Sequence, residues 1–326
     1  MTTHTTLGLS DLIVVDALKK SRYAAIAEAK AEQACRALGI YLPNLRDYNT
    51  MSAYLFPYTS ADKLFAITVF NNLLFYIDDC LDRNDGATPD SAYRMSLFAR
   101  LIHTFTSGEV RHKGDVLEEA TAYVREVMLP LADKRWLKRL IANTKHHLEA
   151  TTASSGVERA LGGKALLEHF MHVRQHDSGM VPTVDLIEFA SGVYLPDEVH
   201  RHPTIVAAKQ ETTLAAALMN DIFSYHREVI LQGSDFNLIA VMGKAYGLGF
   251  ARALGYSIDT INGIIASFLA REEALPVYQD PQLTQAVRDY YAMLKDQINA
   301  AWHWQLVGTN RYRASDSPFE ELRHKL

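Results

Sequence analysis

The chain has 326 residues, and 48% of them are hydrophobic, which suffices for one large or two ordinary domains with a substantial core. The net charge of -5 gives no electrostatic basis for binding nucleic acid or an anionic membrane. The two cysteines are too few for a disulfide framework. The apolar run 12–18 is interrupted by Asp16, and no other run reaches membrane length. We therefore expect a soluble, cytoplasmic protein without membrane insertion.

Apolar residues recur at helical spacing along most of the chain, and alternating strand patterns are nearly absent. Residues 1–10 predict a mobile arm. Helical segments are predicted at residues 11–38, 50–55, 60–83, 89–106, 115–131, 133–152, 163–177, 183–192, 196–199, 203–233, 237–247, 257–274 and 281–306. Gly179 and Pro182 interrupt the pattern. The sequence predicts one all-α domain, residues 1–326, that forms a helical bundle, with 307–326 as a C-terminal lid or tail.

The predicted helix that begins at Ser60 ends in three aspartates. Asp78 and Asp82 are four residues apart and share a helix face, whereas Asp79 points away from it. Carboxylates crowded at the end of an apolar helix repel one another unless a cation lies among them, and oxygen ligands suit Mg²⁺ or Mn²⁺. Taken alone, so short a motif is more often a solvated helix end, so a second pattern has to decide.

A second set of oxygen ligands lies on the predicted helix 203–233. Asn220, Ser224 and Glu228 follow one another at four-residue steps, so an amide, a hydroxyl and a carboxylate line one helical stripe. The alternative is an ordinary polar stripe facing solvent, but apolar residues flank these three closely. Two such patterns on two apolar helices predict a metal–diphosphate site at the mouth of an apolar cavity.

Together the two motifs make the chain resemble a class I terpene synthase (terpene cyclase) of the bacterial type, over about residues 56–312. The aspartate-rich motif of that family matches Asp78, Asp79 and Asp82, and its second motif matches Asn220, Asp221, Ser224 and Glu228. The resemblance implies a class I terpenoid synthase-like bundle around an apolar active-site cavity. Prenyl-chain elongating enzymes carry a second aspartate-rich motif where this chain has residues 220–228, which favours cyclisation over elongation.

The resemblance also implies roles for residues near the helix break and the C-terminus. Most of them would bind the substrate diphosphate, for which guanidinium groups are chemically suited. The matching positions are Arg174 as the diphosphate sensor, Asp177 as its linker, Ser178 or Gly179 as the effector, Arg227 as a diphosphate contact, and Arg311 with Tyr312 as the pair that closes over the diphosphate. For each arginine the alternative is a solvated surface charge.

The implied reaction ionises a linear prenyl diphosphate, farnesyl or geranylgeranyl diphosphate, and cyclises the carbocation to a sesquiterpene or diterpene hydrocarbon or alcohol. The resemblance implies Mg²⁺ as the cofactor, in a cluster of three ions that Mn²⁺ can replace, and a homodimer as the assembly. Such a cation needs an aromatic wall that excludes water, for which Phe75 and a C-terminal tryptophan, foremost Trp304, are the candidates. A chain-elongating transferase and a non-catalytic binder of a prenyl diphosphate remain alternatives.

Overall fold

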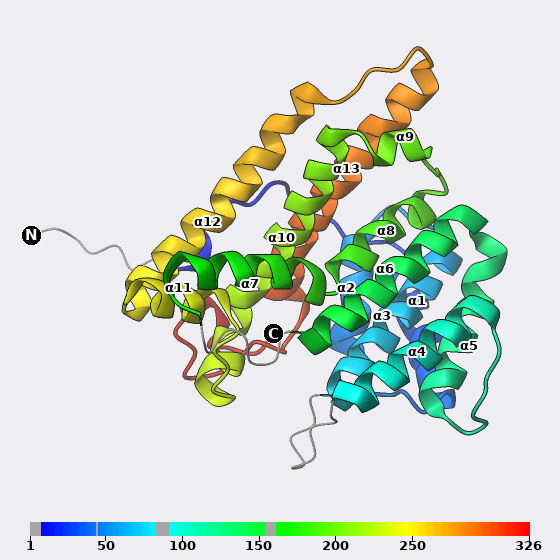
Figure 1. Ribbon diagram of the computed structural model, residues 1–326, viewed down its shortest axis with the longest axis horizontal. Helices are drawn as coiled ribbons and strands as arrows, with labels where there is room; N and C mark the ends of the chain where they lie inside the picture. Colours follow the sequence, from blue (N-terminus) through cyan, green and yellow to red (C-terminus); the bar gives the residue numbers. More distant parts are fainter. Residues whose placement is uncertain (1–7, 44, 82–90, 154–160) are drawn as a thin grey trace, which may run out of the picture. The chain divides into compact units, whose positions relative to one another are not determined.

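The computed structural model describes residues 8–43, 45–81, 91–153 and 161–326, and every regular element in these ranges is helical (Figure 1). The all-α prediction is therefore confirmed. The chain clusters into two compact units. The α3 unit comprises residues 19–153 and 181–196, and the α10 unit comprises residues 1–18, 154–180 and 197–326. The prediction of a single domain stays a prediction.

The α3 unit is built around α3, Ala61–Leu81, which is apolar on most of its faces and therefore buried rather than amphipathic. This helix packs against α1, α2 and α5. On α1, the small buried residues Ala27 and Ala31 permit close packing. The other helices of this unit are α1 (Ala24–Ala37), α2 (Leu45–Leu55), α4 (Ser91–Ser107), α5 (Val116–Met128), α6 (Lys134–Ala153) and most of α8 (Met180–Ser191).

The α10 unit is built around α10, Pro203–Tyr225, which contacts α7, α11, α12 and α13. Its buried Ala215, Ala216 and Ala217 let these neighbours approach. The remaining helices are α7 (Gly163–Asp177), α9 (Asp197–His200), α11 (Leu238–Tyr246), α12 (Phe250–Ala270) and α13 (Pro281–His303). After α13, the predicted tail folds back on this unit, because Tyr312 accepts a hydrogen bond from Asn220 on α10 and Phe319 packs against Phe250 on α12 with ring centroids 6.3 Å apart.

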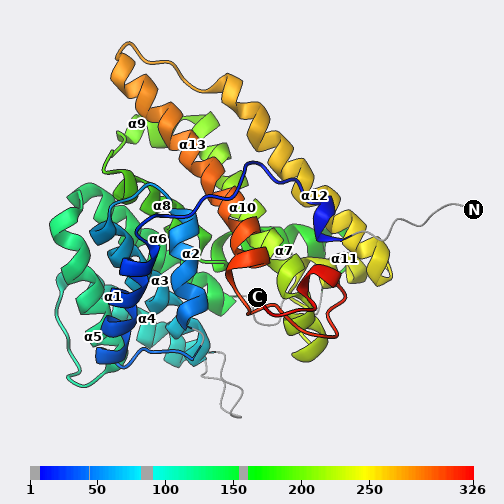
Figure 2. The ribbon, with the colours of Figure 1, turned by 180° about the vertical axis from the view of Figure 1, so that it is seen from behind.

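Over residues 11–38, where the pattern predicts one or two turns of entry followed by an amphipathic helix, the helix begins later than predicted. Residues 9–11 form a single 3₁₀ turn, and α1 begins only at Ala24. The stretch between them is held by α12 and α13, since Ile13 N donates to Asn262 Oδ1 and Asp16 N donates to Asn299 Oδ1. Figure 2 shows this N-terminal segment running beside both helices. Tertiary hydrogen bonds therefore override the local helical pattern. Of the predicted mobile arm, residues 1–7 lie outside the described residues.

Two helices end in wide turns that the sequence pattern did not predict. The α10 helix passes into the π-helical turn η4, His226–Leu231, and α13 passes into the π-helical turn η6, Trp304–Gly308. The predicted helices to residues 233 and 306 are therefore not α-helical throughout. Pro182 does not extend the helix break as predicted, because it lies in the first turn of α8, where proline is tolerated.

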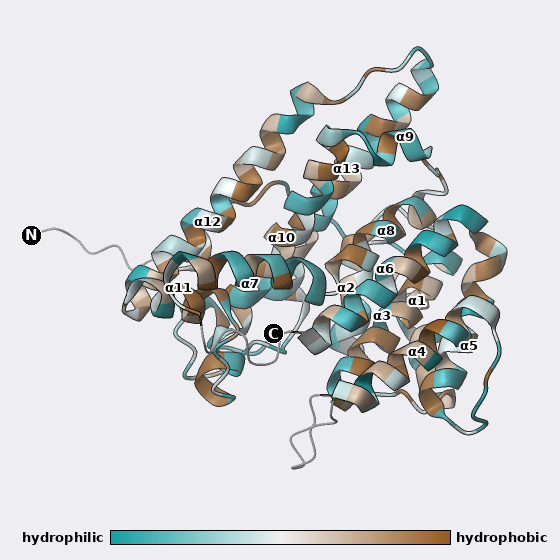
Figure 3. Cartoon of the chain, in the orientation of Figure 1, coloured by the Kyte–Doolittle hydropathy of each residue, from teal (hydrophilic) through white to brown (hydrophobic). Residues whose placement is uncertain are grey.

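Two described stretches, α3 and Phe250–Ala274, are long and apolar enough to cross a membrane by length and composition. This corrects the expectation that no run reaches membrane length. In α3 the most apolar window is 61% buried within the protein, and in Phe250–Ala274 it is 39% buried. Figure 3 shows hydrophobic and hydrophilic residues interspersed along α12. Core helices pass the same test, so it is weak evidence for a membrane span.

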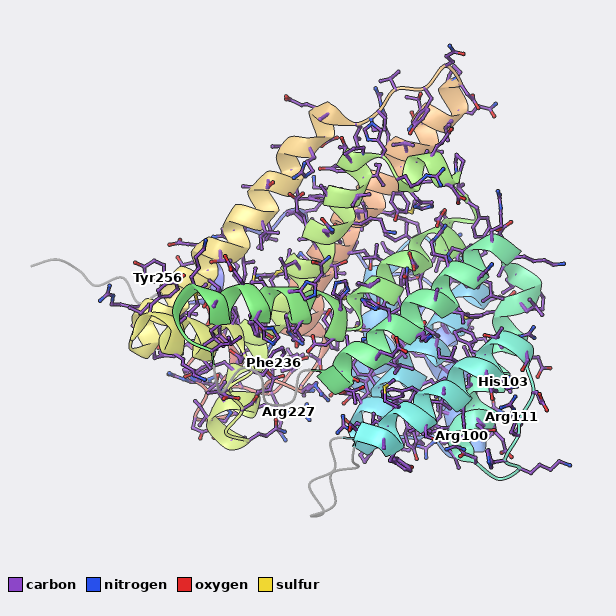
Figure 4. All side chains as sticks on the ribbon, viewed as in Figure 1. Arg100, His103, Arg111, Arg227, Phe236 and Tyr256 are labelled. Atoms are coloured by element: carbon purple, nitrogen blue, oxygen red, sulfur yellow. The ribbon has the colours of Figure 1, made fainter. Side chains whose placement is uncertain are left out.

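A buried carboxylate organises the loop between α4 and α5. Glu118, which is fully buried, accepts hydrogen bonds from the backbone N–H groups of Arg111 and His112 at 2.8 and 3.0 Å and from Arg100 Nη1 at 2.7 Å. Figure 4 shows Arg100, His103 and Arg111 gathered at this end of the α3 unit. Burial opposes the charge, but the hydrogen bonds from His112 and Arg111 outweigh it and lower the pKa of Glu118 from 4.5 to about 2.

Glu118→Gln is expected to lower the free energy of unfolding at neutral pH by about 1–3 kcal/mol, because charged hydrogen bonds are lost. Since the pKa of Glu118 is lower in the folded chain, its contribution is present above pH 4.5 and is lost as the pH falls toward 2. The variant should therefore show a shallower loss of stability over this range in urea denaturation. Glu126→Gln, an exposed change on the same helix, is the control. Equal pH profiles for both variants would contradict this account.

Candidate functional site

The aspartate-rich motif lies at the end of α3. Asp78 is exposed and Asp79 is half-buried in the last turn, whereas Asp82 lies outside the described residues. Within the described ranges, no three His, Cys, Asp or Glu side chains gather closely enough to hold a metal ion. One turn before the acids, Phe75 stacks on Tyr48 with ring centroids 4.1 Å apart. The metal role of the aspartates and the wall role of Phe75 stay predictions.

Arg174 is a partly buried hub in the last turn of α7, with 14% of its side chain exposed. Its Nε and Nη2 lie 2.9 and 2.7 Å from Asp221 Oδ1, its Nη1 donates to Asp177 Oδ1 at 3.3 Å, and its Nη2 donates to Asn220 Oδ1 at 3.3 Å. Burial opposes the charge on Arg174, but the carboxylates of Asp221 and Asp177 outweigh it and raise the pKa of the guanidinium. The alternative of a solvated surface salt bridge is therefore wrong.

The helix break follows directly after this hub. The α7 helix ends at Asp177, and α8 begins at Met180, whose N–H donates to Ser178 Oγ at 3.3 Å. Gly179 has a φ of 73°, in the left-handed region that glycine adopts without a steric penalty. A residue with a side chain would be strained there. The predicted break is confirmed, and the choice between Ser178 and Gly179 as effector stays open.

Asp221 joins the hub to the loop before α11. Its carboxylate is fully buried and also accepts a hydrogen bond from Leu238 N at 3.0 Å. Burial raises the pKa of Asp221 to about 7, and Arg174 limits that rise. The neighbouring Asn237 side chain donates to the Asp221 carbonyl at 2.8 Å and to Glu228 Oε2 at 3.2 Å, and its oxygen caps α11 by accepting from Ile239 N. Asn237 thus ties α11 to both ends of the second motif.

The Asn220 side chain links α10 to the end of the chain. Its Nδ2 donates to Gln305 Oε1 at 2.9 Å and to Tyr312 Oη at 2.7 Å. Trp304 packs against the same tyrosine with ring centroids 6.2 Å apart. Burial raises the pKa of Tyr312, and the charges of Arg311 and Arg227 act against that rise, so both cations lie near it. The structure therefore brings Tyr312, with its neighbour Arg311, to Asn220 of the second motif. Of these cations, Figure 4 labels Arg227, which lies within the motif itself.

Ser224 and Glu228 complete the second motif. Ser224 is 1% exposed, and its Oγ has no hydrogen-bond partner among the described residues. Burying a hydroxyl without a hydrogen-bond partner costs free energy, and a bound cation would supply the missing partner for its oxygen. On a continuous α-helix, a four-residue step drifts by about 40° around the axis. The π-helical turn η4 is wider than an α-turn, so the backbone rotates by a smaller angle per residue. This smaller rotation keeps Glu228 closer to the helix face of Ser224. The donor set of Asn220, Ser224 and Glu228 therefore fits a divalent cation.

Three residues to which the sequence reasoning gave no role hold the site together: Asp221, Asn237 and Gln305. Asp221 lies inside the second motif, but the sequence does not show that its side chain is buried, so its role could not be predicted. Asn237 follows a turn and precedes an apolar run, which is a helix N-cap signal, but that signal does not reveal its bond to Glu228. No sequence signal marks Gln305.

Comparison with known proteins finds a matching family and several relatives. Residues 69–267 match the family described as terpene synthase family 2, C-terminal metal binding. Alpha-muurolene synthase of Coprinopsis cinerea is 28% identical over 282 residues, which cover 85% of this chain and 64% of that protein. Sesquiterpene synthase 3 of Postia placenta is 29% identical over 252 residues, covering 76% of this chain and 66% of that protein. The chain thus spans slightly less than two thirds of these two relatives.

A bacterial relative and two solved structures match over most of their length. The 10-epi-cubebol synthase of Sorangium cellulosum is 23% identical over 278 residues, covering 85% of this chain and 86% of that protein. The structure of a-eudesmol synthase matches with a TM-score of 0.78 and 22% identity, covering 89% of this chain and 97% of that chain. Germacradien-4-ol synthase from Streptomyces citricolor matches with a TM-score of 0.77 and 17% identity, covering 90% and 98%.

These structural matches show a shared all-α fold, as the predicted terpenoid synthase-like bundle requires. The family match covers α10 with its complete Asn220–Glu228 motif and the Arg174 hub. The chain belongs to terpene synthase family 2.

Proposed function

We propose that this protein is a Mg²⁺-dependent class I terpene cyclase that ionises a linear prenyl diphosphate and cyclises the resulting carbocation. The observation that carries the proposal is the unpartnered, buried Ser224 hydroxyl, which stands between Asn220 and Glu228 and close in sequence to the cationic Arg227. Hard oxygen donors beside guanidinium groups suit a cation–diphosphate complex. Family membership and the names of the relatives, which are sesquiterpene synthases, support the proposal.

The residues supply what ionisation needs. Asn220, Ser224 and Glu228 would hold divalent cations, and Asp78, Asp79 and Asp82 are proposed as the further ligands. When bound, such cations neutralise the charge that grows on the departing diphosphate. Arg174, Arg227 and Arg311 would donate hydrogen bonds to the same group, and Tyr312 would close over it. A cluster of three Mg²⁺ ions, replaceable by Mn²⁺, remains part of the proposal.

The carbocation then has to be kept from water. Phe75 and Trp304 are proposed to supply aromatic faces, each of which stabilises a nearby cation by roughly 0.5–2 kcal/mol. Asp177 and Ser178 or Gly179 are proposed to couple Arg174 to the substrate at the break between α7 and α8. Farnesyl diphosphate is the favoured substrate, because relatives are named sesquiterpene synthases and sesquiterpenes have fifteen carbons. A cytoplasmic homodimer without membrane insertion is proposed from the family.

Incubation with farnesyl and geranylgeranyl diphosphates tests the proposal directly. With Mg²⁺ present, we expect inorganic diphosphate together with a cyclic hydrocarbon or alcohol in the organic extract, and neither after chelation of the metal. Added isopentenyl diphosphate should be left unchanged, because a longer diphosphate would identify an elongating transferase. Thermal stabilisation by the substrate without any product would instead identify a non-catalytic binder.

Ser224→Ala separates the metal role from a structural one. Because it removes a buried hydroxyl without a partner, the free energy of unfolding should stay unchanged or rise by about 1 kcal/mol. The Mg²⁺ concentration for half-maximal diphosphate release should rise by at least about 10-fold. Ser257→Ala is the matched control, since this buried hydroxyl donates to the Ala253 carbonyl at 2.8 Å. The control should lose stability and keep its Mg²⁺ dependence, and a reversed pattern would contradict the assignment.

A further inference from the structure

An asparagine side chain can bind a cation only through its oxygen. Rotation by 180° exchanges the oxygen of Asn220 for an NH₂ group of nearly the same size, which would present hydrogens to the cation. The proposed ligand role of Asn220 therefore requires that another group hold the amide in one of its two orientations. The contacts around Asn220 show which group does so.

A directional series of hydrogen bonds runs through this amide. Arg174 Nη2 donates to Asn220 Oδ1 at 3.3 Å, and Asn220 Nδ2 donates to Gln305 Oε1 at 2.9 Å. Gln305 Nε2 in turn donates to the Ala301 carbonyl at 2.7 Å. The second proton of Asn220 Nδ2 is directed at Tyr312 Oη, 2.7 Å away. Every polar atom of the Asn220 amide is thus engaged.

The direction of this series is fixed at both ends. A guanidinium can only donate hydrogen bonds, so the Asn220 atom that faces Arg174 must be the oxygen. A backbone carbonyl can only accept, so the Gln305 atom that faces Ala301 must be the nitrogen, and its oxygen must face Asn220. The two ends demand the same orientation of Asn220. One orientation of each amide therefore satisfies all of its hydrogen-bond partners.

Gln305 is placed for this role by the end of α13. It is 2% exposed and lies in η6, the π-helical turn that follows the helix. Its side chain bonds the Ala301 carbonyl, which is the group that the backbone N–H of residue 305 reaches in an uninterrupted α-helix. In this wide turn, Gln305 Nε2 is fixed by its hydrogen bond to Ala301, and Gln305 Oε1 faces Asn220 on α10.

We infer that Gln305 is a positioning residue that holds the oxygen of Asn220 in the ligand orientation, with Tyr312 as the second acceptor. The inference rests on the proposed function, because it assigns Gln305 a role only if Asn220 binds a cation. Gln305 itself touches neither cation nor substrate in this role. Its removal should therefore weaken cation binding without changing which substrate is used.

Mn²⁺ titration in the presence of inorganic diphosphate tests the inference without turnover. Free Mn²⁺ is followed by electron paramagnetic resonance. For Gln305→Leu, the half-saturating Mn²⁺ concentration should rise about 10–100-fold, the usual effect of losing a partner of a metal ligand. Gln305→Met, which keeps the length of the side chain, is the second variant and should behave alike. Gln285→Leu, on the exposed face of the same α13, is the control and should bind as the unaltered protein does.

Adding Gln305→Leu to the variant Asn220→Asp distinguishes a role of Gln305 in orienting the amide from a role in packing. The carboxylate of Asn220→Asp has two equivalent oxygens and needs no orienting partner, so adding Gln305→Leu to it should weaken Mn²⁺ binding no further. A further loss of about 10-fold in this background would overturn the inference. So would unchanged binding by both Gln305 variants in a protein that binds Mn²⁺, and the proposed function would then stand. If the unaltered protein binds no Mn²⁺ in the presence of diphosphate, both the proposed function and the role of Gln305 are contradicted.

Discussion

Arg174→Met is expected to lower the free energy of unfolding by about 3–5 kcal/mol, because it leaves the fully buried Asp221 carboxylate without its counter-charge. Diphosphate release should fall by at least about 10²-fold, the usual effect of removing a donor that stabilises developing negative charge. Urea denaturation and a diphosphate-release assay measure the two effects. This is the largest loss of stability that we expect from one substitution in the second motif and its surroundings.

The double variant Arg174→Met with Asp221→Leu separates the two effects. It removes the buried charge together with its partner, so much of the stability should return while turnover stays low. Arg271→Met is the matched control, because Arg271 makes an equally short ion pair with Glu211 but is 34% exposed. The control should cost about 1 kcal/mol or less and leave turnover intact. If Arg174→Met unfolds no more readily than Arg271→Met, the Arg174 hub does not stabilise the fold.

Glu228→Gln is expected to reduce diphosphate release by about 10²–10³-fold while changing stability little. Glutamine keeps the side-chain length and an oxygen that can accept from Asn237, as Glu228 Oε2 does at 3.2 Å, but it loses the charge that a divalent cation needs. The assay is diphosphate release at increasing Mg²⁺ concentration, where a high concentration should recover part of the activity. Asp78→Asn tests the aspartate-rich motif in the same way and should also abolish turnover.

Asp259→Asn, an exposed change on α12, controls for the loss of one negative charge and should leave the Mg²⁺ dependence unchanged. Normal turnover by Glu228→Gln would remove Glu228 from the cation ligands and leave Asn220 and Ser224 without a charged partner. A folded but inactive Glu228→Gln that still binds Mn²⁺ as the unaltered protein does would assign Glu228 a different role in the reaction.

The sequence predicted the helices because they depend on local patterns. Apolar spacing carries helix type, and the glycine at position 179 correctly marked the end of α7, since its φ of 73° suits glycine alone. The three residues Asn220, Ser224 and Glu228 lie on α10 and its continuation, as the helical pattern predicted, and their role as cation ligands stays a prediction.

The sequence did not predict features that depend on distant partners. Residues 12–22 have a helical pattern, but Asn262 and Asn299 bind their backbone in a non-helical form. The turn η4 has no composition signal, because a wide turn differs from an α-turn in hydrogen-bond register rather than in residue preference. Asp221 belongs to the matched motif, but only the packing of α7 and α11 against α10 shows that its carboxylate is buried.

The hydrogen bonds of Asn220 with Gln305 and Tyr312 also form late during synthesis, because both partners lie far along the chain from Asn220. The two acceptors follow Asn220 by 85 and 92 residues. A ribosome that has completed α10 and α11 has therefore not yet made the groups that orient this amide, and chains grow at roughly 5–20 residues per second. The nascent chain passes through a period in which the motif and Arg174 are present but both acceptors of the Asn220 Nδ2 group are missing. Gln305 and Tyr312 can therefore accept hydrogen bonds from the Asn220 amide only once the last helix and the tail have been added.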